Sequence, residues 1–214
     1  MLGTNMAISD IRLHANDLSD EALALYTGDV AIDTETLGLN PHRDRLCVVQ
    51  LSPGDGSADV VQIAKGQKKA PNIISLLRDR KKTKIFHFGR FDIAVLEHAF
   101  GVQANPVFCT KIASKLTRTY TDRHGLKNLT SEMLGIDLSK QQQSSDWAAE
   151  KLSQAQLEYA ASDVVYLHQL MEAMNQRLER DGRTKQAKAC FDFLPTRAKL
   201  DLMGWPDHDI FSHA

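Results

Sequence analysis

The clearest pattern of hydrophobic and polar positions lies in the last third of the chain. From Leu157 to Leu178, apolar side chains recur at steps of three and four residues, which is the spacing of one buried helical face. Ser153 precedes this segment and is expected to cap the helix. Tyr159 and Asp163 are four residues apart, so they share a face at the border of the buried stripe. The pattern predicts one long helix that presents a phenol and a carboxylate to a cleft.

Apolar runs in the first half of the chain predict the strands of a sheet. Residues 29–33, 46–51 and 59–63 follow one another with only turns between them, so an antiparallel start to the sheet is expected. Residues 11–14 are expected to form an edge strand, and residues 84–87 a later strand. Further elements are expected as a brief strand over residues 107–109 and as helices over residues 21–26, 71–78, 89–100, 111–119, 126–134, 183–193 and 198–203. This order predicts a single α/β domain with a mixed β-sheet flanked by helices.

Length and composition are those of a globular domain. The chain has 214 residues, of which 43% are hydrophobic, enough to bury a sizeable core. Its apolar runs are far shorter than a membrane span, and no basic segment precedes an apolar one near the N-terminus. The 3 cysteines lie far apart, which argues against a disulfide framework and a cysteine zinc site. These features predict a cytoplasmic protein with no membrane segment.

The net charge is −1, so a role with nucleic acid cannot rest on overall basicity. Two segments are nevertheless basic. Residues 64–84 hold eight Lys or Arg against Asp79 alone, and we favour a solvated face there over nucleic-acid contact. Residues 111–127 hold five Lys or Arg against Asp122 alone, together with Tyr120 and His124. For this second segment we favour contact with substrate phosphates.

Four carboxylates stand where a sheet and its helices could bring them together. Asp33 ends a strand, and Glu35 points to the same side two residues later. Asp92 lies in the first turn of the helix after residues 84–87, and Asp163 lies on the late helix. Such a cluster would repel itself unless hard divalent cations were bound. Two such ions can cleave a phosphodiester bond, and Tyr159 could orient the attacking water.

Each of these residues also has an ordinary structural explanation. An Asp-x-Glu after a strand is commonly a solvated strand end, and Asp92 alone would favour a helix dipole. Tyr159 alone would be an aromatic residue at the edge of the core. Their joint occurrence, each on a suitable element, favours the metal site.

Three short segments resemble the exonuclease motifs of the DEDD superfamily of 3′→5′ exonucleases: DTET at residues 33–36, HFGRFD at 87–92 and YAASD at 159–163. Glu158 occupies the place where one branch carries histidine, so Tyr159 puts the chain in the tyrosine branch, which includes ribonuclease D. The segment KQQQSSDW at 140–147 and the order of elements over residues 28–178 also resemble ribonuclease D. The short, single-domain nanoRNase C type is most similar, down to FDFLPTRAKLDLMGW at 191–205.

This resemblance implies an RNase H-like fold and Mg²⁺ or Mn²⁺, with two ions per active site. It implies a hydrolase that removes nucleotides from RNA 3′ ends and, for the nanoRNase C type, degrades short RNA down to dinucleotides to give nucleoside monophosphates. It further implies a ring-shaped homo-oligomer, an octamer. The expected parts are an N-terminal segment over residues 1–27, an exonuclease domain over 28–180, and a C-terminal helical extension over 181–214, with no separate HRDC domain.

Several further residues are candidates for contact with substrate. In related enzymes a leucine six residues after the first aspartate wedges against the bases; Leu39 holds that position, with packing of its loop on the core as the alternative. Phe88 stands where tyrosine-branch relatives usually carry asparagine, and it could stack on a base or belong to the core. For His87 we favour a hydrogen-bonded structural role over a ligand role.

Two groups of residues are expected to contact phosphates. Lys140, Gln143 and Ser145 are expected to contact the backbone, with Trp147 packed beneath them. A second group of Lys115, Arg118 and Arg123 is expected to grip a 5′-phosphate, which would favour short substrates because cations at a fixed distance measure length.

Three apolar residues stand among polar ones in the C-terminal tail. Trp205, Ile210 and Phe211 could cover the chain's own core or another subunit, and we favour the subunit contact.

The sequence thus predicts a metal-dependent 3′→5′ exoribonuclease acting on short single-stranded RNA. One alternative keeps the same site but makes DNA ends or structured RNA the main substrate. Another, an inactive scaffold that binds nucleic acid, is disfavoured because all four carboxylates and the tyrosine are present.

Overall fold

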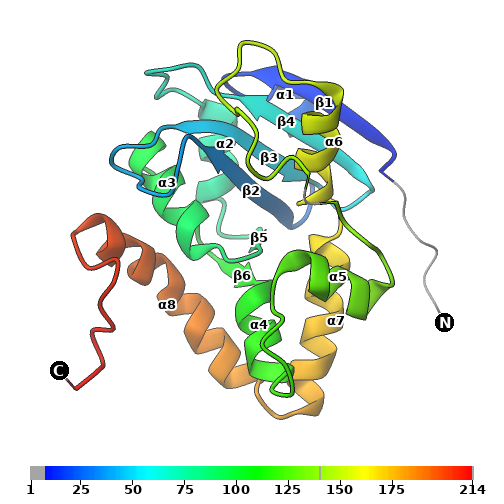
Figure 1. Ribbon diagram of the computed structural model, residues 1–214, viewed down its shortest axis with the longest axis vertical. Coiled ribbons are helices and arrows are strands. Elements are labelled where there is room, and N and C mark those ends of the chain that lie inside the picture. Colours follow the sequence, from blue (N-terminus) through cyan, green and yellow to red (C-terminus); the bar gives the residue numbers. More distant parts are fainter. Residues whose placement is uncertain (1–7, 140, 214) are drawn as a thin grey trace.

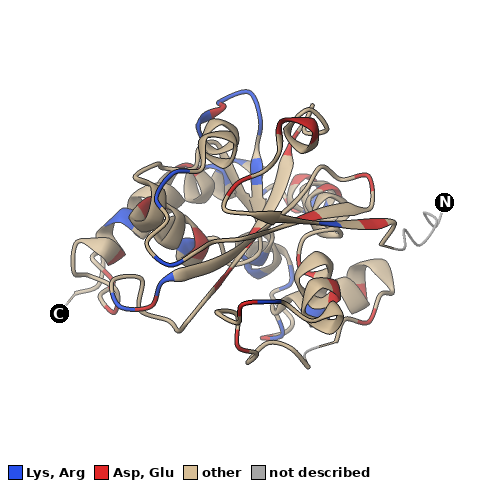
Figure 2. Cartoon of the chain, turned by 90° about the horizontal axis from the view of Figure 1, so that it is seen from above, with Lys and Arg blue, Asp and Glu red and all other residues tan. Residues whose placement is uncertain are grey.

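The computed structural model describes residues 8–139 and 141–213 as a mixed sheet with helices on both sides (Figures 1 and 2). The strands are β1 (Asp10–Ala15), β2 (Val30–Thr36), β3 (Leu46–Ser52), β4 (Ser57–Gln62), β5 (Lys84–Phe86) and β6 (Val107–Cys109). Their order across the sheet is β1-β4-β3-β2-β5-β6. β2, β3 and β4 pair antiparallel, and β1, β5 and β6 join in parallel. The predicted mixed α/β sheet, its antiparallel start and its edge strand near residue 11 are confirmed.

The helices form layers over this sheet. They are α1 (Asp20–Leu23), α2 (Pro71–Arg78), α3 (Arg90–Phe100), α4 (Thr110–Thr117), α5 (Leu126–Leu134), α6 (Gln154–Ser162), α7 (Leu167–Arg180) and α8 (Thr184–Leu202). α6 packs against β1, β3 and β4, while α3 packs against β2 and β3. α8 runs along α3, α4 and α7 towards the C-terminal end (Figure 1). β3 is buried along its whole length, as expected of a central strand with neighbours on both faces.

The predicted long helix is interrupted directly after the site residues, so the prediction of one continuous helix is wrong. Ser153 does cap α6, and its side chain and that of Gln156 form a reciprocal capping box. α6 ends at Ser162, with Asp163 as its C-cap, and α7 begins only at Leu167. The Ser162 hydroxyl donates to the Tyr159 carbonyl at 2.7 Å, a side-chain bond that competes with the helical ladder. The interruption places Asp163 at a helix end.

The C-terminal helices show the opposite error. Two helices over 183–193 and 198–203 were predicted, but α8 continues through Pro195 to Leu202. Pro195 itself is buried in the helix, together with Phe191 on the preceding turn. The Phe191 ring packs 4.6 Å from that of Phe108 on β6, so tertiary packing stabilises a helix that a proline would otherwise weaken. α1 is also shorter than the predicted helix over 21–26.

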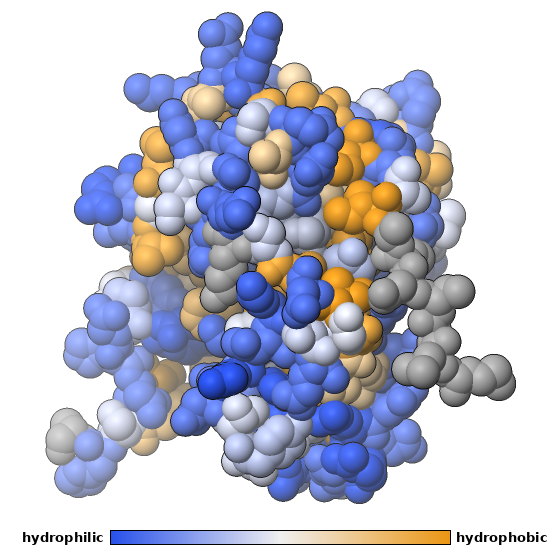
Figure 3. Space-filling model, turned by 45° about the vertical axis from the view of Figure 1, so that its right-hand side comes forward, coloured by the Kyte–Doolittle hydropathy of each residue, from blue (hydrophilic) through white to orange (hydrophobic). Residues whose placement is uncertain are grey.

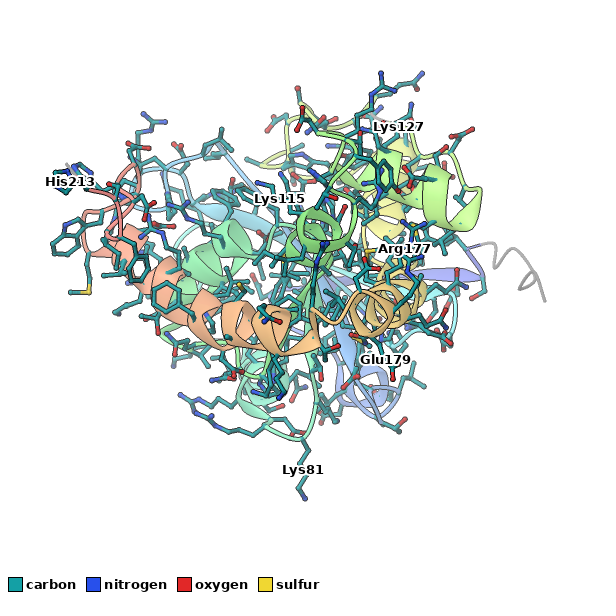
Figure 4. All side chains as sticks on the ribbon, turned by 90° about the horizontal axis from the view of Figure 1, so that it is seen from below. Lys81, Lys115, Lys127, Arg177, Glu179 and His213 are labelled. Atoms are coloured by element: carbon teal, nitrogen blue, oxygen red, sulfur yellow. The ribbon has the colours of Figure 1, made fainter. Side chains whose placement is uncertain are left out.

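Six of the eight cations in the first basic segment are exposed to solvent, and the preference for a solvated face over nucleic-acid contact stays a prediction. Figure 4 shows Lys81 projecting from the body on the side opposite Lys127. Lys84 is an exception because it is fully buried. Its ammonium donates to the carbonyls of Asp79, Lys82 and Asn105 at 2.6–2.8 Å, and burial lowers its pKa to about 8. That lysine belongs to the fold rather than to the surface.

The surface itself is largely polar. The face in Figure 3 is mainly hydrophilic, with hydrophobic atoms gathered towards its upper right. In the C-terminal tail, Trp205, Ile210 and Phe211 are exposed, so they do not cover the core of this chain. Within the described residues, no helix combines the length and the apolar character that crossing a bilayer requires.

Candidate active site

Three elements bring carboxylates together at the end of β2. Asp33 and Glu35 project from the same side of this strand, and Asp163 reaches them from the C-cap of α6. One oxygen atom of each of these three side chains lies within 4.8 Å of the other two. The strand alternation that puts Asp33 and Glu35 on one side turns Thr34 to the other. There the Thr34 hydroxyl donates to the carboxylate of Asp92 in the first turn of α3, at 2.6 Å.

All four carboxylates are harder to ionise than ordinary ones. Burial, followed by the charges of Asp163 and Asp92, raises the pKa of Glu35 to about 9. Burial raises the pKa values of Asp92 and Asp163 to about 7 each. The pKa of Asp33 is also raised well above its usual range by burial and by the three other carboxylates. Ionising all four together therefore requires additional positive charge.

The described part of the chain does not provide that charge. No Lys or Arg is among the groups that shift the pKa values of these four acids. The side chain directly across the sheet from Asp33 is Gln50 on β3, which is neutral. Its buried amide has no hydrogen-bond partner within residues 8–139 and 141–213. An all-oxygen cluster without its own cation fits hard divalent ions such as Mg²⁺ and Mn²⁺.

Tyr159 borders this cluster from one turn before Asp163. Its hydroxyl is close enough to Asp163 to lower the pKa of that acid, against the larger effect of burial. Burial and the charges of Asp163, Glu35 and Asp33 raise the pKa of Tyr159, so the phenol stays protonated at neutral pH. Its ring lies 6.0 Å from that of buried Trp147, at a tilt of 41°. The tyrosine is thus held in place beside the carboxylates.

A cavity of about 560 Å³ is lined by three of the carboxylates, those of Asp33, Glu35 and Asp163. Six of the predicted substrate residues line it: Leu39, His87, Phe88, Gln143, Ser145 and Trp147. The predicted Lys140 lies outside the described residues. Leu39 is 85% exposed, which excludes the alternative in which it packs on the core. The cavity therefore gathers these side chains from three distant stretches of the sequence next to the acidic cluster.

His87 has the structural role that was favoured for it. Its Nδ1 forms a hydrogen bond of 2.8 Å with the Thr110 hydroxyl. Burial, followed by the nearby charge of Lys111, lowers the pKa of His87 to about 3. The ring is therefore neutral at physiological pH, and it ties the turn after β5 to the first residue of α4.

The cations predicted to grip a 5′-phosphate are not among the residues that line this cavity. Arg118 is 1% exposed, and its guanidinium is bound to Glu132, to the Ser114 hydroxyl and to the Arg123 carbonyl. Because these partners take up its N–H groups, the guanidinium is not free to bind a phosphate. The structure therefore argues against a phosphate-binding role for Arg118. Together with Arg123 it lines a separate cavity. Lys115 is exposed on the last turn of α4.

Two lysines that the sequence did not single out line the acidic cavity instead. Lys111 lies in the first turn of α4 and Lys127 in the first turn of α5; Figure 4 shows Lys127 on the outer side of its helix. The only signal in the sequence was their membership of the basic segment over residues 111–127. That signal names the segment that contains both lysines, but not the residues within it.

Comparison with known proteins places the chain in a family. Residues 8–179 match the model of a 3′–5′ exonuclease family. A ribonuclease D of Gluconacetobacter diazotrophicus is 36% identical over 154 residues, which cover 72% of this chain and 39% of that protein. The chain thus spans about two fifths of the length of this curated relative.

Solved structures are more similar still. The structure of Brucella melitensis NrnC bound to pGG is 73% identical in sequence, with a TM-score of 0.93, covering 96% of this chain and 99% of the other. The structure of Brucella melitensis NrnC with bound Mg²⁺ is 71% identical, with a TM-score of 0.92, covering 96% of this chain and all of the other. These matches extend over the sheet, the acidic cluster and α8 alike.

Proposed function

This chain belongs to the 3′–5′ exonuclease family, and we propose that it degrades short RNA from the 3′ end, down to dinucleotides, to give nucleoside monophosphates. The observation that carries this proposal is the acidic cluster itself. Three carboxylates meet within 4.8 Å, without a cation from the described chain and at the wall of a cavity that a short oligonucleotide could enter. Such a cluster is best explained as a site that holds divalent ions next to a phosphodiester.

Asp33, Glu35, Asp92 and Asp163 would hold two ions, Mg²⁺ or Mn²⁺, in this enzyme. When bound, the ions make a water molecule a better nucleophile and neutralise charge that develops on the phosphate oxygens. The similarity to a protein solved with bound Mg²⁺ supports the choice of metal. Thr34 would steady Asp92 through its hydrogen bond of 2.6 Å, because partners of this kind fix the orientation of a metal ligand.

Tyr159 would hold the attacking water in line with the scissile bond. Its raised pKa keeps the phenol protonated, so its hydroxyl can donate one hydrogen bond and accept another without taking up charge. Packing against Trp147 limits the movement of the ring. Orientation of the water, rather than removal of its proton, is the role that this environment favours.

The substrate would lie along the cavity between the loop of Leu39 and the segment of Gln143 and Ser145. Leu39, being exposed, would contact a base, while Gln143 and Ser145 would donate to phosphate oxygens. The similarity to a structure bound to pGG supports a substrate of two nucleotides. Lys115 and Arg123 do not line this cavity, so they would contact a phosphate only at the site of an adjacent subunit. Lys140 remains a candidate for phosphate contact.

The enzyme would work in the cytoplasm as a homo-oligomeric ring, an octamer. The exposed apolar residues Trp205, Ile210 and Phe211 favour contact with another subunit. The 3 cysteines, two of them buried and all of them free, are consistent with a reducing compartment.

Hydrolysis of a 5′-labelled RNA series, from dinucleotides to long oligomers, tests this function. The series is incubated with Mg²⁺, with Mn²⁺ or with EDTA, and alongside DNA of the same lengths. The proposal requires that the RNA dinucleotide disappears fastest and that EDTA stops the reaction. Persistence of dinucleotides while longer RNA or DNA shortens would indicate a broader 3′–5′ exonuclease, and activity that survives EDTA would contradict the metal mechanism.

A further inference from the structure

The backbone of Phe88 adopts a conformation that a bulky residue rarely takes. Its φ is +66°, in the left-handed region that disfavours side chains with a Cβ. Among the other described non-glycine residues, positive φ occurs only at Asn16, a residue type that tolerates it. Phe88 also keeps 47% of its surface exposed and lines the acidic cavity. An exposed aromatic ring on a strained backbone suggests a function, because the fold gains nothing from either property.

The surrounding structure holds this strained turn in place. A Cβ on Gly89 would meet the Phe86 side chain at 2.6 Å, so the turn lies directly on the core. The buried Cys109 thiol lies beside this turn and beside the start of α4. Burial raises its pKa, while the backbone N–H groups of Ile112, Gly89, Phe88 and Lys111 oppose that shift.

Lys111 covers part of the Phe88 ring with its charge. Its ammonium nitrogen lies 4.1 Å from the ring centroid, well inside the range of a cation–π contact. The residue remains half exposed with this cation on one face of its ring, so part of its surface is left for another planar group. A nucleobase is such a group, and every base can stack on an aromatic ring whatever its identity.

We propose that Phe88 and Lys111 form a stacking platform for one nucleobase of the substrate, with Lys111 on one face of the ring and the base on the other. This inference rests on the proposed function, since it assigns a place to a base in the same cavity. The platform would bind the base through its π-face rather than its hydrogen-bonding edge. It therefore predicts tolerance of base sequence, with tighter binding of purines than of pyrimidines because purines stack more strongly.

Substitutions at Phe88 separate the strain from the stacking. Phe88→Asn removes the ring and accepts the left-handed backbone, whereas Phe88→Leu removes the ring and keeps the strain. We expect Phe88→Asn to have a Tm equal to that of the wild type or higher by about 2–4 °C, and Phe88→Leu to show no such gain. Thermal unfolding in EDTA measures both. If Phe88→Asn had a Tm clearly below that of Phe88→Leu, the claim that the backbone at residue 88 is strained would be contradicted.

Binding of RNA dinucleotides that contain 2-aminopurine tests the platform itself. The fluorescence of this base falls when it stacks, so a titration gives a Kd and reports stacking directly. We expect Phe88→Leu and Phe88→Asn each to weaken binding by roughly ten-fold or more, and Phe88→Tyr, which keeps an aromatic face, to restore it. A dinucleotide that lacks the stacked base should bind all of these proteins equally. Equal Kd values for the base-containing dinucleotide in wild type and Phe88→Leu would overturn the platform.

Lys111→Met, which keeps the length of the side chain but not its charge, tests the second member. If Lys111 acts through the Phe88 ring, the effect of removing its charge depends on that ring. Lys111→Met should then weaken binding less in the Phe88→Leu background than in the wild type. If Lys111 instead bound a phosphate directly, the two effects would add, and the dinucleotide without the base would be equally affected. That result would remove Lys111 from the platform.

The same proteins distinguish failure of the platform from failure of the proposed function. If the wild type cleaves RNA dinucleotides and Phe88→Leu leaves KM unchanged, the platform alone is contradicted. Wild type that binds dinucleotides through Phe88 but cleaves none in Mg²⁺ or Mn²⁺ would contradict the proposed function alone.

Discussion

Two acidic centres lie on the same sheet, one fully buried and one half-buried, and they are treated in opposite ways. Asp59 on β4 is fully buried and accepts hydrogen bonds from Arg12 at 2.8 and 2.9 Å and from Tyr26 at 2.6 Å. His14 lies 2.7 Å from the same carboxylate. The pKa of Asp59 is lowered because these partners outweigh the effect of burial. At the end of β2, by contrast, four carboxylates have raised pKa values and no cation from the described chain.

The register of the sheet accounts for the difference. Arg12 on β1 stands directly across from Asp59, while neutral Gln50 on β3 stands directly across from Asp33. Residues in these positions lie about 5 Å apart at Cβ, so an arginine in place of Gln50 could have neutralised Asp33. The chain thus neutralises the acid that only stabilises the fold and leaves uncompensated the acids that would bind metal.

The largest effect should follow from removing a carboxylate of the site. Asp163→Asn should lower kcat for RNA hydrolysis on the order of 10³-fold, because the metal loses a ligand. Its Tm in EDTA should be at least that of the wild type, since one of four mutually repelling groups is gone. Steady-state kinetics and thermal unfolding on the same preparation measure both quantities. A protein that loses its fold together with its activity would make Asp163 structural.

The opposite centre should respond in the opposite way. Asp59→Asn should lower the free energy of unfolding by about 3 kcal/mol, because it leaves Arg12 without its buried partner. Activity per folded molecule should remain, since Asp59 is not among the residues lining the cavity. Urea unfolding and kinetics at low temperature measure these effects. Loss of activity without loss of stability would show that the two centres are not separate.

The two centres should also give opposite dependences on pH. The folded pKa values of Glu35, Asp92 and Asp163 are raised, so their favourable contribution is complete below about pH 4 and is lost as the pH rises to about 9. Asp59 has a lowered pKa, so its contribution is complete above its unfolded value and is lost only as the pH falls.

Metal-free protein should therefore lose Tm between pH 6 and 9, where the contribution of Asp59 is constant. Mg²⁺ at about 100 times its Kd should restore about 2.7 kcal/mol, and more at pH 9 than at pH 6, where protons compete. Thermal unfolding across this range, with and without Mg²⁺, measures the effect. Asp163→Asn serves as the control that should lose most of the response, and a wild-type Tm that is flat with pH in EDTA would contradict the repulsion.

The smallest predicted effect concerns the hydrogen bond that orients Asp92. Thr34→Val removes the donor to that carboxylate and should weaken Mg²⁺ binding by about ten-fold, while Thr34→Ser retains the hydroxyl and should bind as the wild type does. Mg²⁺ titrations followed by Tm compare the two variants. Equal binding by Thr34→Val would mean that Asp92 does not depend on this bond.

Local patterns in the sequence were sufficient for the strands, for the cap at Ser153 and for the grouping of Asp33, Glu35 and Asp163. They failed where distant residues decide. Arg118 looked available to a phosphate, but Glu132, fourteen residues further on, takes its guanidinium. Two helices were predicted, over residues 183–193 and 198–203, but α8 is continuous through Pro195, and Phe191 packs on the core one turn earlier. Periodicity favoured a single helix, and a side-chain hydrogen bond from Ser162 accompanies its interruption.

The cations of the site show the same limit. The basic segment over residues 111–127 was predicted to contact substrate, and of its five cations only Lys111 and Lys127 line the cavity. Each lies in the first turn of its helix, and both of these turns border the cavity. Counting charges along the sequence finds the basic segment. Which of its lysines line the cavity depends on where each helix begins relative to the sheet.

Calorimetric titration of metal-free protein with Mn²⁺ tests the central claim most directly. The wild type should bind two ions per chain near pH 7 and release protons as it does so, because the carboxylates of the site are partly protonated there. Asp163→Asn should lose at least one ion, and Asp59→Asn, compared as folded protein, should bind both. Absence of binding to the wild type, or the same stoichiometry and affinity in Asp163→Asn, would contradict the assignment of these carboxylates as a metal site.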